Sequence, residues 1–235
     1  MNWKESKSLS LAYIYKDEPE FAGNLKYTLE SLEKLSIDDN IELVILKDLN
    51  GHNALLDEEV GDLIWQYRHK NKFKINFYTD SFNNNFSEWK NKLFNICARD
   101  YILNLDADEH IRYDFFVKLF NDNYIIDDHS LMNIPRINIY NPALTEEDKN
   151  IARKWGWNFT NEFTAKDCVN FPDFQGRFYK NDGSVEWVGK VHERIFGKNN
   201  EFKSCALYPK SITDCIIHVK TFSKQIQQNS LYNSI

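Results

Sequence analysis

Four short apolar runs, separated by segments with apolar residues at helical spacing, account for most of the first 106 residues. The runs have the length of strands and lie at Ser8–Tyr15, Ile41–Leu46, Phe73–Thr79 and Tyr101–Leu105. Helices are expected between them, at Glu20–Leu35, Leu56–Tyr67 and Phe86–Cys97. Strands that alternate with helices form right-handed βαβ units and a parallel sheet. An α/β fold is therefore expected.

The pattern changes after residue 110. A helix is expected at Ile111–Phe120, and short strands, mixed or antiparallel, are expected at Ser130–Tyr140, Gln175–Lys180, Ser184–Val188 and Cys215–Val219. A terminal helix is expected at Phe222–Tyr232. The least regular segment, 141–166, carries Trp155 and Trp157, and we expect it to be a mobile loop over a site. With no repeat or linker, residues 1–235 are expected to form a single domain.

Composition excludes several classes of protein. The chain is 42% hydrophobic, with 17 Phe, 12 Tyr and 6 Trp, which is enough for a packed core rather than a disordered chain. Its net charge of -6 gives no long-range attraction to nucleic acid or anionic membranes. It has neither an apolar run long enough to span a bilayer nor a signal-like N-terminus. The four cysteines are widely spaced, so we expect reduced thiols and a cytoplasmic location.

An acidic segment follows the fourth expected strand, with Asp106, Asp108 and Glu109 inside four residues. Ligands of open α/β sheets bind at this edge of the sheet. Three neighbouring carboxylates repel one another unless a cation compensates, and their hard oxygens suit Mg²⁺ or Mn²⁺. The alternative is a solvated acidic turn at the start of the next helix.

Five sequence blocks, in order, resemble glycosyltransferase family 2. They are LAYIYKDE at Leu11–Glu18, FSEWKN at Phe86–Asn91, RDYILNLDADE at Arg99–Glu109, and two later blocks, Asp173–Tyr179 and Trp187–Glu193, that are similar to a bacterial and phage branch. The resemblance covers about residues 9 to 233. It implies a GT-A fold, with a Rossmann-like, mostly parallel sheet flanked by helices and added antiparallel strands. It also implies a nucleotide-sugar donor bound by residues 1–110, an acceptor bound by residues 111–235, a divalent metal, and inversion at the anomeric carbon.

The resemblance assigns donor and metal roles to particular residues. Asp106 and Asp108 match the DxD pair, with Asp108 as the direct metal ligand and Asp106 near the ribose or the metal. Asp48 matches the acidic residue that pairs with uracil, and Tyr15 and Asp17 lie at the base-binding turn. Lys90 stands where the family usually has Arg, so it keeps the charge but loses the planar fork.

The later blocks supply candidates for the chemistry. Glu193 is the expected general base and Asp173 the second candidate; an ion pair of Glu193 with Arg194 or Lys190 is the structural alternative. The remaining candidates are His218 as a metal ligand, His192 and Arg177 at phosphate or acceptor, and Trp155, Trp157 and Trp187 stacked on a sugar or base. Whether His218 or His192 completes the metal site stays open.

The expected function is therefore inverting transfer of a sugar from a UDP-sugar to an acceptor hydroxyl, with Mn²⁺ or Mg²⁺. The resembled branch includes enzymes that act on surface glycans and lipopolysaccharide, and similar phage enzymes act on hydroxymethylated DNA bases. Two alternatives remain: a nucleotidylyltransferase that makes nucleotide-sugars, and a non-catalytic nucleotide- or carbohydrate-binding module. The turn Tyr15–Pro19 lacks the glycines of a phosphate loop, which counts against the nucleotidylyltransferase.

Overall fold

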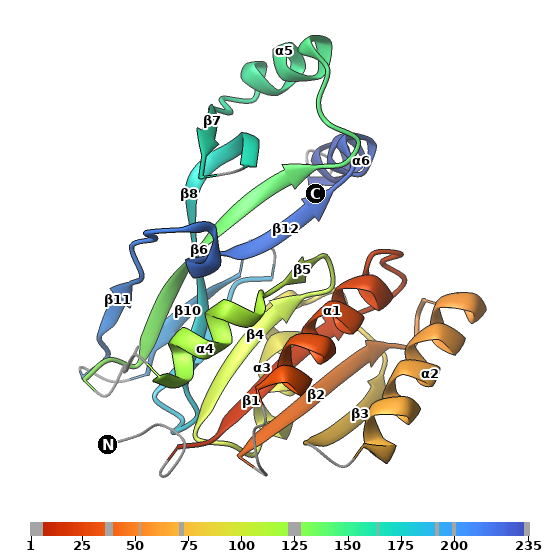
Figure 1. Ribbon diagram of the computed structural model, residues 1–235, viewed down its shortest axis with the longest axis vertical. Helices are drawn as coiled ribbons and strands as arrows, with labels where there is room; N and C mark the ends of the chain where they lie inside the picture. The colour runs from red at the N-terminus through yellow and green to blue at the C-terminus, as the bar shows by residue number, and fades with distance from the viewer. Residues whose placement is uncertain are drawn as a thin grey trace.

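One ten-stranded sheet joins the two halves of the chain in the part that the computed structural model describes (Figure 1). The described residues are 7–35, 40–51, 53–70, 73–121, 128–163, 165–190, 193–198 and 201–232. The strand order is β3-β2-β1-β4-β8-β6-β12-β5, with β11 paired to β6 and β7 paired to β8. The change from parallel to antiparallel pairing falls between β4 and β8.

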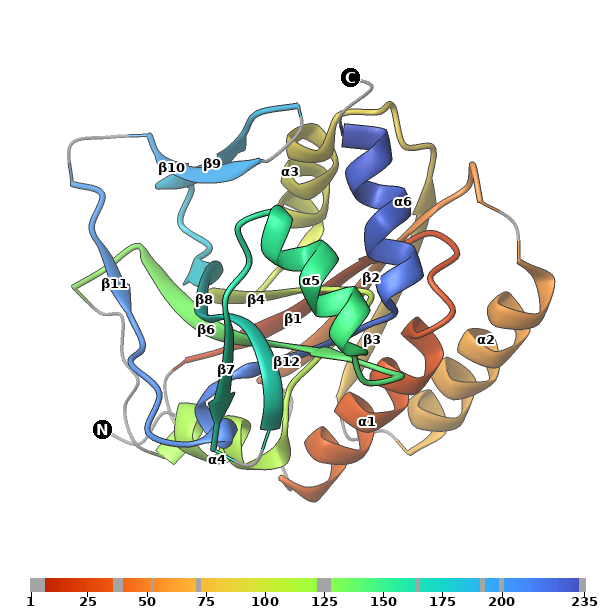
Figure 2. The same ribbon diagram turned by 90° about the horizontal axis from the view of Figure 1, so that it is seen from above.

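The first four strands are parallel, as expected from the alternating pattern. They are β1 (Leu9–Tyr15), β2 (Ile41–Asp48), β3 (Lys74–Asp80) and β4 (Tyr101–Asp106), and the helices between them are α1 (Phe21–Lys34), α2 (Ala54–His69) and α3 (Phe86–Ile96). Figure 2 shows α1 and α2 on one side of the sheet and α3 on the other. The α/β prediction for this half is confirmed.

Burial on both faces explains why these strands are apolar throughout. In β1, Leu11 and Tyr13 pack on the side of α1 and α2, whereas Ala12 packs with Trp89 and Leu93 of α3. Asparagine caps position the helices, since Asn53 and Asn85 each accept a bond from a backbone N–H in the first turn. The carboxyl ends of the parallel strands therefore meet at one edge, beside the helix N-termini.

The second half extends the sheet with antiparallel strands, as expected, except that the expected strand Ser184–Val188 lies in a separate hairpin. Long β8 (Ala165–Lys180) lies between β4 and β6 (Leu131–Tyr140), and β12 (Ile216–Lys220) runs parallel to β6. Two-residue β5 (Glu109–His110) pairs with β12 and so brings the acidic segment against His218. The remaining elements are α4 (Tyr113–Asn121), the hairpin β9 (Val185–Val188) and β10 (Arg194–Gly197), β11 (Ser204–Ala206), the 3₁₀ turn η2 (Ile212–Asp214) and α6 (Phe222–Tyr232).

The segment 141–166 was expected to be irregular, and that prediction is wrong for its described residues. It contains α5 (Glu146–Lys154) and β7 (Phe159–Glu162). Thr145 and Asp148 form a reciprocal capping box that starts α5. Trp157 packs against Tyr140, with ring centres 6.1 Å apart, and Trp155 packs against Phe222 at 5.6 Å. These contacts tie α5 to β6 and α6, above the sheet in Figure 1.

None of the helices in the described ranges is both long and apolar enough to cross a membrane.

Candidate functional site

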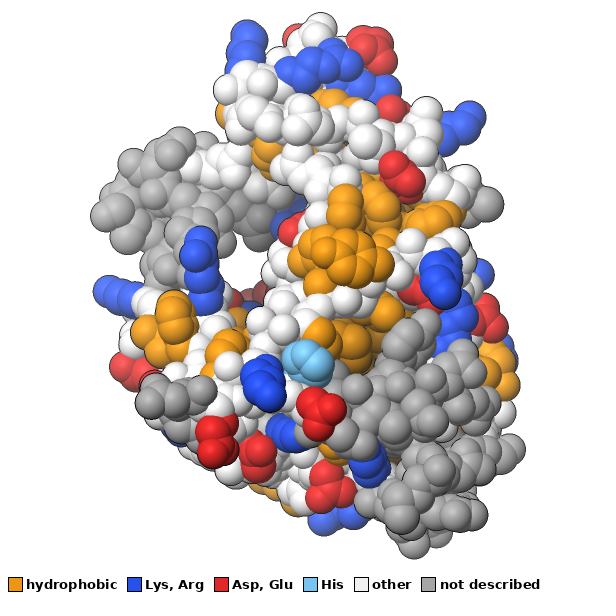
Figure 3. Space-filling view, turned by 90° about the vertical axis from the view of Figure 1, so that its left-hand side faces the viewer, with side chains coloured by type: hydrophobic (Ala, Val, Ile, Leu, Met, Phe, Trp, Pro, Cys, Tyr) orange, Lys and Arg blue, Asp and Glu red, His pale blue; other side chains and the backbone are white. Residues whose placement is uncertain are grey.

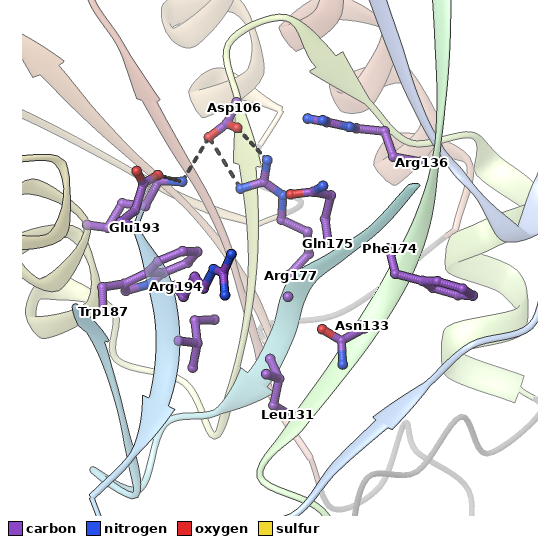
Figure 4. Close-up of a pocket in the computed structure, with 13 residues that line it drawn as sticks. Asp106, Leu131, Asn133, Arg136, Phe174, Gln175, Arg177, Trp187, Glu193 and Arg194 are labelled. Atoms are coloured by element: carbon purple, nitrogen blue, oxygen red, sulfur yellow. Dashed lines mark hydrogen bonds and ion pairs between the residues drawn. The ribbon is translucent and has the colours of Figure 1, made fainter. Parts of the chain in front are cut away.

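Two cavities meet at the carboxyl end of β4. The Asp108 cavity, of about 440 Å³, is lined by Asp106, Asp108 and residues of β12 and α6, including His218, Lys220 and Lys224. The Trp187 cavity, of about 650 Å³, is lined by Trp187 and Arg194 of the β9–β10 hairpin and by residues of β6 and β8 (Figure 4). Both cavities are lined by Lys90, Asp106, Arg136 and Glu193, which we call the shared wall.

The turn that carries the DxD pair is held by neighbouring elements. Asn24 of α1 donates to the Ala107 carbonyl, 3.0 Å away, and the amide of Val219 on β12 donates to the Asp108 carbonyl, 3.3 Å away. Asp108 is only 9% exposed. The acidic segment thus faces into the cavities, which does not fit a solvated turn.

Asp106 is bound by two cations. Arg177 donates from both terminal nitrogens to its two oxygens, and Lys90 Nζ lies 3.4 Å from Oδ1 (Figure 4). Burial alone would raise the pKa of Asp106, but the charges of Arg177 and Lys90 outweigh it and hold this pKa well below its ordinary value. Asp106 is therefore an ionised carboxylate in the shared wall.

Asp108 lies between a histidine and a lysine. His218 Nε2 is 3.1 Å from its Oδ1, and Lys224 Nζ is 3.2 Å from its Oδ2. Burial opposes ionisation, yet the His218 ring and the nearby ammonium groups of Lys220 and Lys224 hold the pKa of Asp108 below its ordinary range. Burial lowers the pKa of His218, which favours the neutral ring. Strand pairing thus brings together Asp108 and His218, which are 110 residues apart in the sequence.

Glu109, to which the sequence analysis gave no role of its own, holds the shared wall together. Its fully buried carboxylate accepts bonds from Arg136 Nη1 at 2.9 Å, Arg177 Nη2 at 2.8 Å and the Asp106 amide at 2.9 Å. Arg136 was missed as well, although an arginine inside the apolar run Ile134–Ile137 is a usable signal. A charge in a buried strand requires a partner of opposite charge.

Glu193 faces the cavities and pairs with Lys90. Lys90 Nζ lies 2.7 Å from Glu193 Oε1, so the expected alternative partners Arg194 and Lys190 are not the ones found. The same ammonium lies 4.3 Å from the centre of the Trp187 ring, and Trp187 is only 7% exposed. Lys90 therefore lies over the Trp187 ring, and little of this side chain is exposed.

Asp173, the second candidate base, is saturated with hydrogen bonds. Its Oδ2 accepts from Arg136 Nε and Nη2 and from Asn138 Nδ2, and its Oδ1 accepts from Gln175 Nε2 at 2.6 Å. Burial would raise the pKa of Asp173, but Arg136 and these hydrogen bonds lower it. A carboxylate held this way is a poor proton acceptor.

The residues expected to bind the base are divided between the two faces of the sheet. Asp48 Oδ1 accepts from the amides of Asn50 and Phe82, whereas Oδ2 is buried without a hydrogen bond from any described residue; Lys16 Nζ lies 3.8 Å away. Asp17 lies beside Gly51, which follows β2. A Cβ on Gly51 would collide with the Asp17 side chain. Tyr15 lies on the other face and lines a separate cavity with Lys47 and Asp57.

The remaining candidates lie elsewhere. Trp155 and Trp157 pack in the cluster formed by α5, β6 and α6 and line neither cavity. His192 lies outside the described residues.

Phe174, in the Trp187 cavity, contacts Tyr208, which is 75% exposed. Hydrophobic side chains gather near the middle of the face shown in Figure 3.

Comparison with known proteins supports the fold. No family model and no curated protein matches the sequence. Among solved structures, S. aureus TarS 1–349 aligns at a TM-score of 0.50 with 13% identity, over 90% of this chain and 60% of that one. The same fragment in complex with UDP-GlcNAc aligns at 0.48, with 14% identity over 91% and 58%. The chain thus spans about 60% of the TarS fragment, and at this identity the likeness concerns the fold alone.

Proposed function

We propose that this chain is an inverting glycosyltransferase that moves a sugar from a UDP-sugar to an acceptor hydroxyl. The supporting observation is the shared wall, because a donor in the Asp108 cavity and an acceptor in the Trp187 cavity would meet at Asp106 and Glu193. The fold is consistent with this proposal, since S. aureus TarS 1–349 was also solved with UDP-GlcNAc and with UDP.

Uridine recognition is assigned to the carboxyl end of β2, where Asp48 is the last residue. Oδ2 of the buried Asp48 accepts no hydrogen bond from the described residues and is suited to accept the N3–H of uracil. Lys220 and Lys224 line the Asp108 cavity and supply positive charge for a diphosphate.

A divalent cation, Mn²⁺ or Mg²⁺, is assigned to Asp108 and His218. No three His, Cys, Asp or Glu side chains within the described ranges already form a metal cluster. Asp108 Oδ1 and His218 Nε2 nevertheless converge to 3.1 Å inside a cavity, and a carboxylate with an imidazole is a donor set that Mn²⁺ accepts. Asp106 is the neighbouring carboxylate. The bound cation would neutralise the diphosphate leaving group.

Glu193 is assigned as the general base. Its described polar contact is the single ion pair with Lys90, whereas Asp173 has both oxygens occupied. As the acceptor oxygen bonds to the anomeric carbon and the bond to the diphosphate breaks, the hydroxyl proton passes to Glu193. A base on the acceptor side, opposite the leaving group, gives inversion. The proposed acceptor is a glycan, a glycolipid or a hydroxymethylated DNA base.

Incubation with a panel of UDP-sugars and Mn²⁺, followed by measurement of the released products, tests this function. UDP release that depends on an acceptor supports the proposal. A parallel incubation with a nucleoside triphosphate and a sugar phosphate tests the alternative, since release of pyrophosphate there would identify a nucleotidylyltransferase. Binding of UDP with neither product, across glycan and hydroxymethylated-DNA acceptors, would identify a binding module.

A further inference from the structure

Asn138 and His218 are directly paired residues on neighbouring strands. Asn138 of β6 and His218 of β12 are opposite one another in the parallel register. Asn138 Oδ1 lies 2.7 Å from His218 Nδ1, and His218 is 2% exposed. The other ring nitrogen, Nε2, faces Asp108. Asn138 therefore contacts the ring on the side opposite the acidic segment.

The orientation of the Asn138 amide is determined by its other contacts. Its Nδ2 donates to the Val169 carbonyl at 3.2 Å and to Asp173 Oδ2 at 3.0 Å. Rotating the amide by 180° would set its oxygen against these two acceptors. The amide oxygen must therefore face His218, and a hydrogen bond there requires the proton to lie on Nδ1.

We propose that Asn138 is a positioning residue that holds the proton of His218 on Nδ1 and thereby presents the lone pair of Nε2 to a divalent cation beside Asp108. This inference rests on the metal part of the proposed function. It also gives Asp173 a role other than that of the base, because Asp173 anchors the amide that orients His218. Groups that orient metal-bound histidines in this way tune both the tautomer and the metal affinity.

The tautomer is measured directly in the metal-free protein. The chain is labelled with ¹⁵N-histidine, and its long-range ¹H–¹⁵N spectrum is recorded well above the ordinary histidine pKa of about 6.5. His218→Gln identifies the signals of His218. The expected result is a protonated Nδ1 in the wild type, because Asn138 Oδ1 accepts from it. Nε2 faces the Asp108 carboxylate and can bind a proton while the cation is absent. A wild-type His218 protonated on Nε2 alone overturns the proposal without any variant of Asn138.

Variants test whether Asn138 causes this state. Asn138→Ala and Asn138→Leu are expected to move the proton toward Nε2, and the larger leucine serves if alanine prevents folding. Asn181→Ala is the matched control, because the Nδ2 of Asn181 likewise donates to two oxygen atoms, the carbonyls of Cys97 and Arg99, and Asn181 lines neither cavity. If His218 keeps its proton on Nδ1 in a folded Asn138 variant, the proposal is wrong.

Mn²⁺ affinity gives a second measurement, independent of sugar transfer. Titration of Mn²⁺ followed by electron paramagnetic resonance should show a loss of about 10–100-fold for Asn138→Ala and none for Asn181→Ala. If the wild type binds Mn²⁺ and Asn138→Ala binds it with the same affinity, this inference is overturned and the metal part of the proposed function is not. A wild type that binds no Mn²⁺ overturns it together with the metal part of the proposed function.

Discussion

Lys90 Nζ lies 2.7 Å from Glu193 Oε1, in the wall shared by the two cavities. The same ammonium is 3.4 Å from Asp106 Oδ1 and is covered by Trp187. Because Lys90 is only 5% exposed, water screens these charges weakly. Lys90 therefore holds Glu193 in the wall between the two cavities, which is the position that the proposed base requires.

Glu193→Gln should abolish transfer while leaving UDP binding intact. The amide keeps the size of the side chain but cannot take the acceptor proton, so kcat should fall by about 10²–10⁴-fold. Acceptor-dependent UDP release measures the rate, and calorimetry measures UDP binding. Glu186→Gln, on the exposed side of β9, is the control and should keep wild-type activity. Near-normal turnover in Glu193→Gln would remove Glu193 from the mechanism.

Asp48→Asn should change the preferred base from uracil toward cytosine. The two amides that bind Oδ1 keep the oxygen of the asparagine in place, so its NH₂ group occupies the position of Oδ2. That group repels the N3–H of uracil but can donate to the N3 of cytosine. UDP affinity should drop by about tenfold or more, and CDP affinity should rise. Calorimetric titration with UDP and CDP checks this, and an unchanged preference would place the base elsewhere.

The outline of the fold could be predicted because local signals carried it. The strands β1, β2 and β4 are apolar runs buried on both faces, and their predicted bounds differ from the observed ones by one or two residues. For β8, only Gln175–Lys180 was predicted, whereas the strand begins at Ala165. Its first ten residues mix polar and apolar types and include Pro172, so no period-two pattern marks them.

The site was less predictable because it depends on long-range register. Asp106, Asp108 and Glu193 do line one cavity, but no local pattern indicates that β5 pairs with β12 and places His218 at Asp108. Tyr15 illustrates a different limit. Side chains alternate along a strand, so Tyr15 shares a face with Tyr13 under α1, away from the face of Asp48. That separation follows from residue parity once the register is known, since Tyr15 is opposite Lys47 rather than Asp48.

Glu109→Gln should destabilise the protein strongly. The change removes the fully buried negative charge that both Arg136 and Arg177 contact. Removing one partner of such a buried pair costs about 3–5 kcal/mol. Urea denaturation measures the loss. The control is Glu186→Gln, because the Glu186 carboxylate is half-exposed and lies 3.9 Å from Lys198. This change should alter the free energy of unfolding by less than about 0.5 kcal/mol.

The ionisation of Asp214, which pairs with Lys118 of α4, should make the free energy of unfolding depend on pH. Burial would raise the pKa of Asp214, but Lys118 and the amides of Lys210 and Ser211 donate to its carboxylate and lower this pKa. The stabilisation that ionised Asp214 provides is therefore complete above its pKa in the unfolded chain, about 3.9. It is lost as the pH falls through the lower pKa of the folded protein, because the unfolded chain binds the proton more tightly.

Asp214→Asn should accordingly lower the free energy of unfolding by about 1–3 kcal/mol at neutral pH. The difference from the wild type should shrink as the pH falls below about 4. Lys118→Met removes one donor to the same carboxylate and should show a smaller loss with the same direction of pH dependence. Urea denaturation of the three proteins across this range checks both statements. A difference that stays constant with pH would mean that the carboxylate charge does not stabilise this turn.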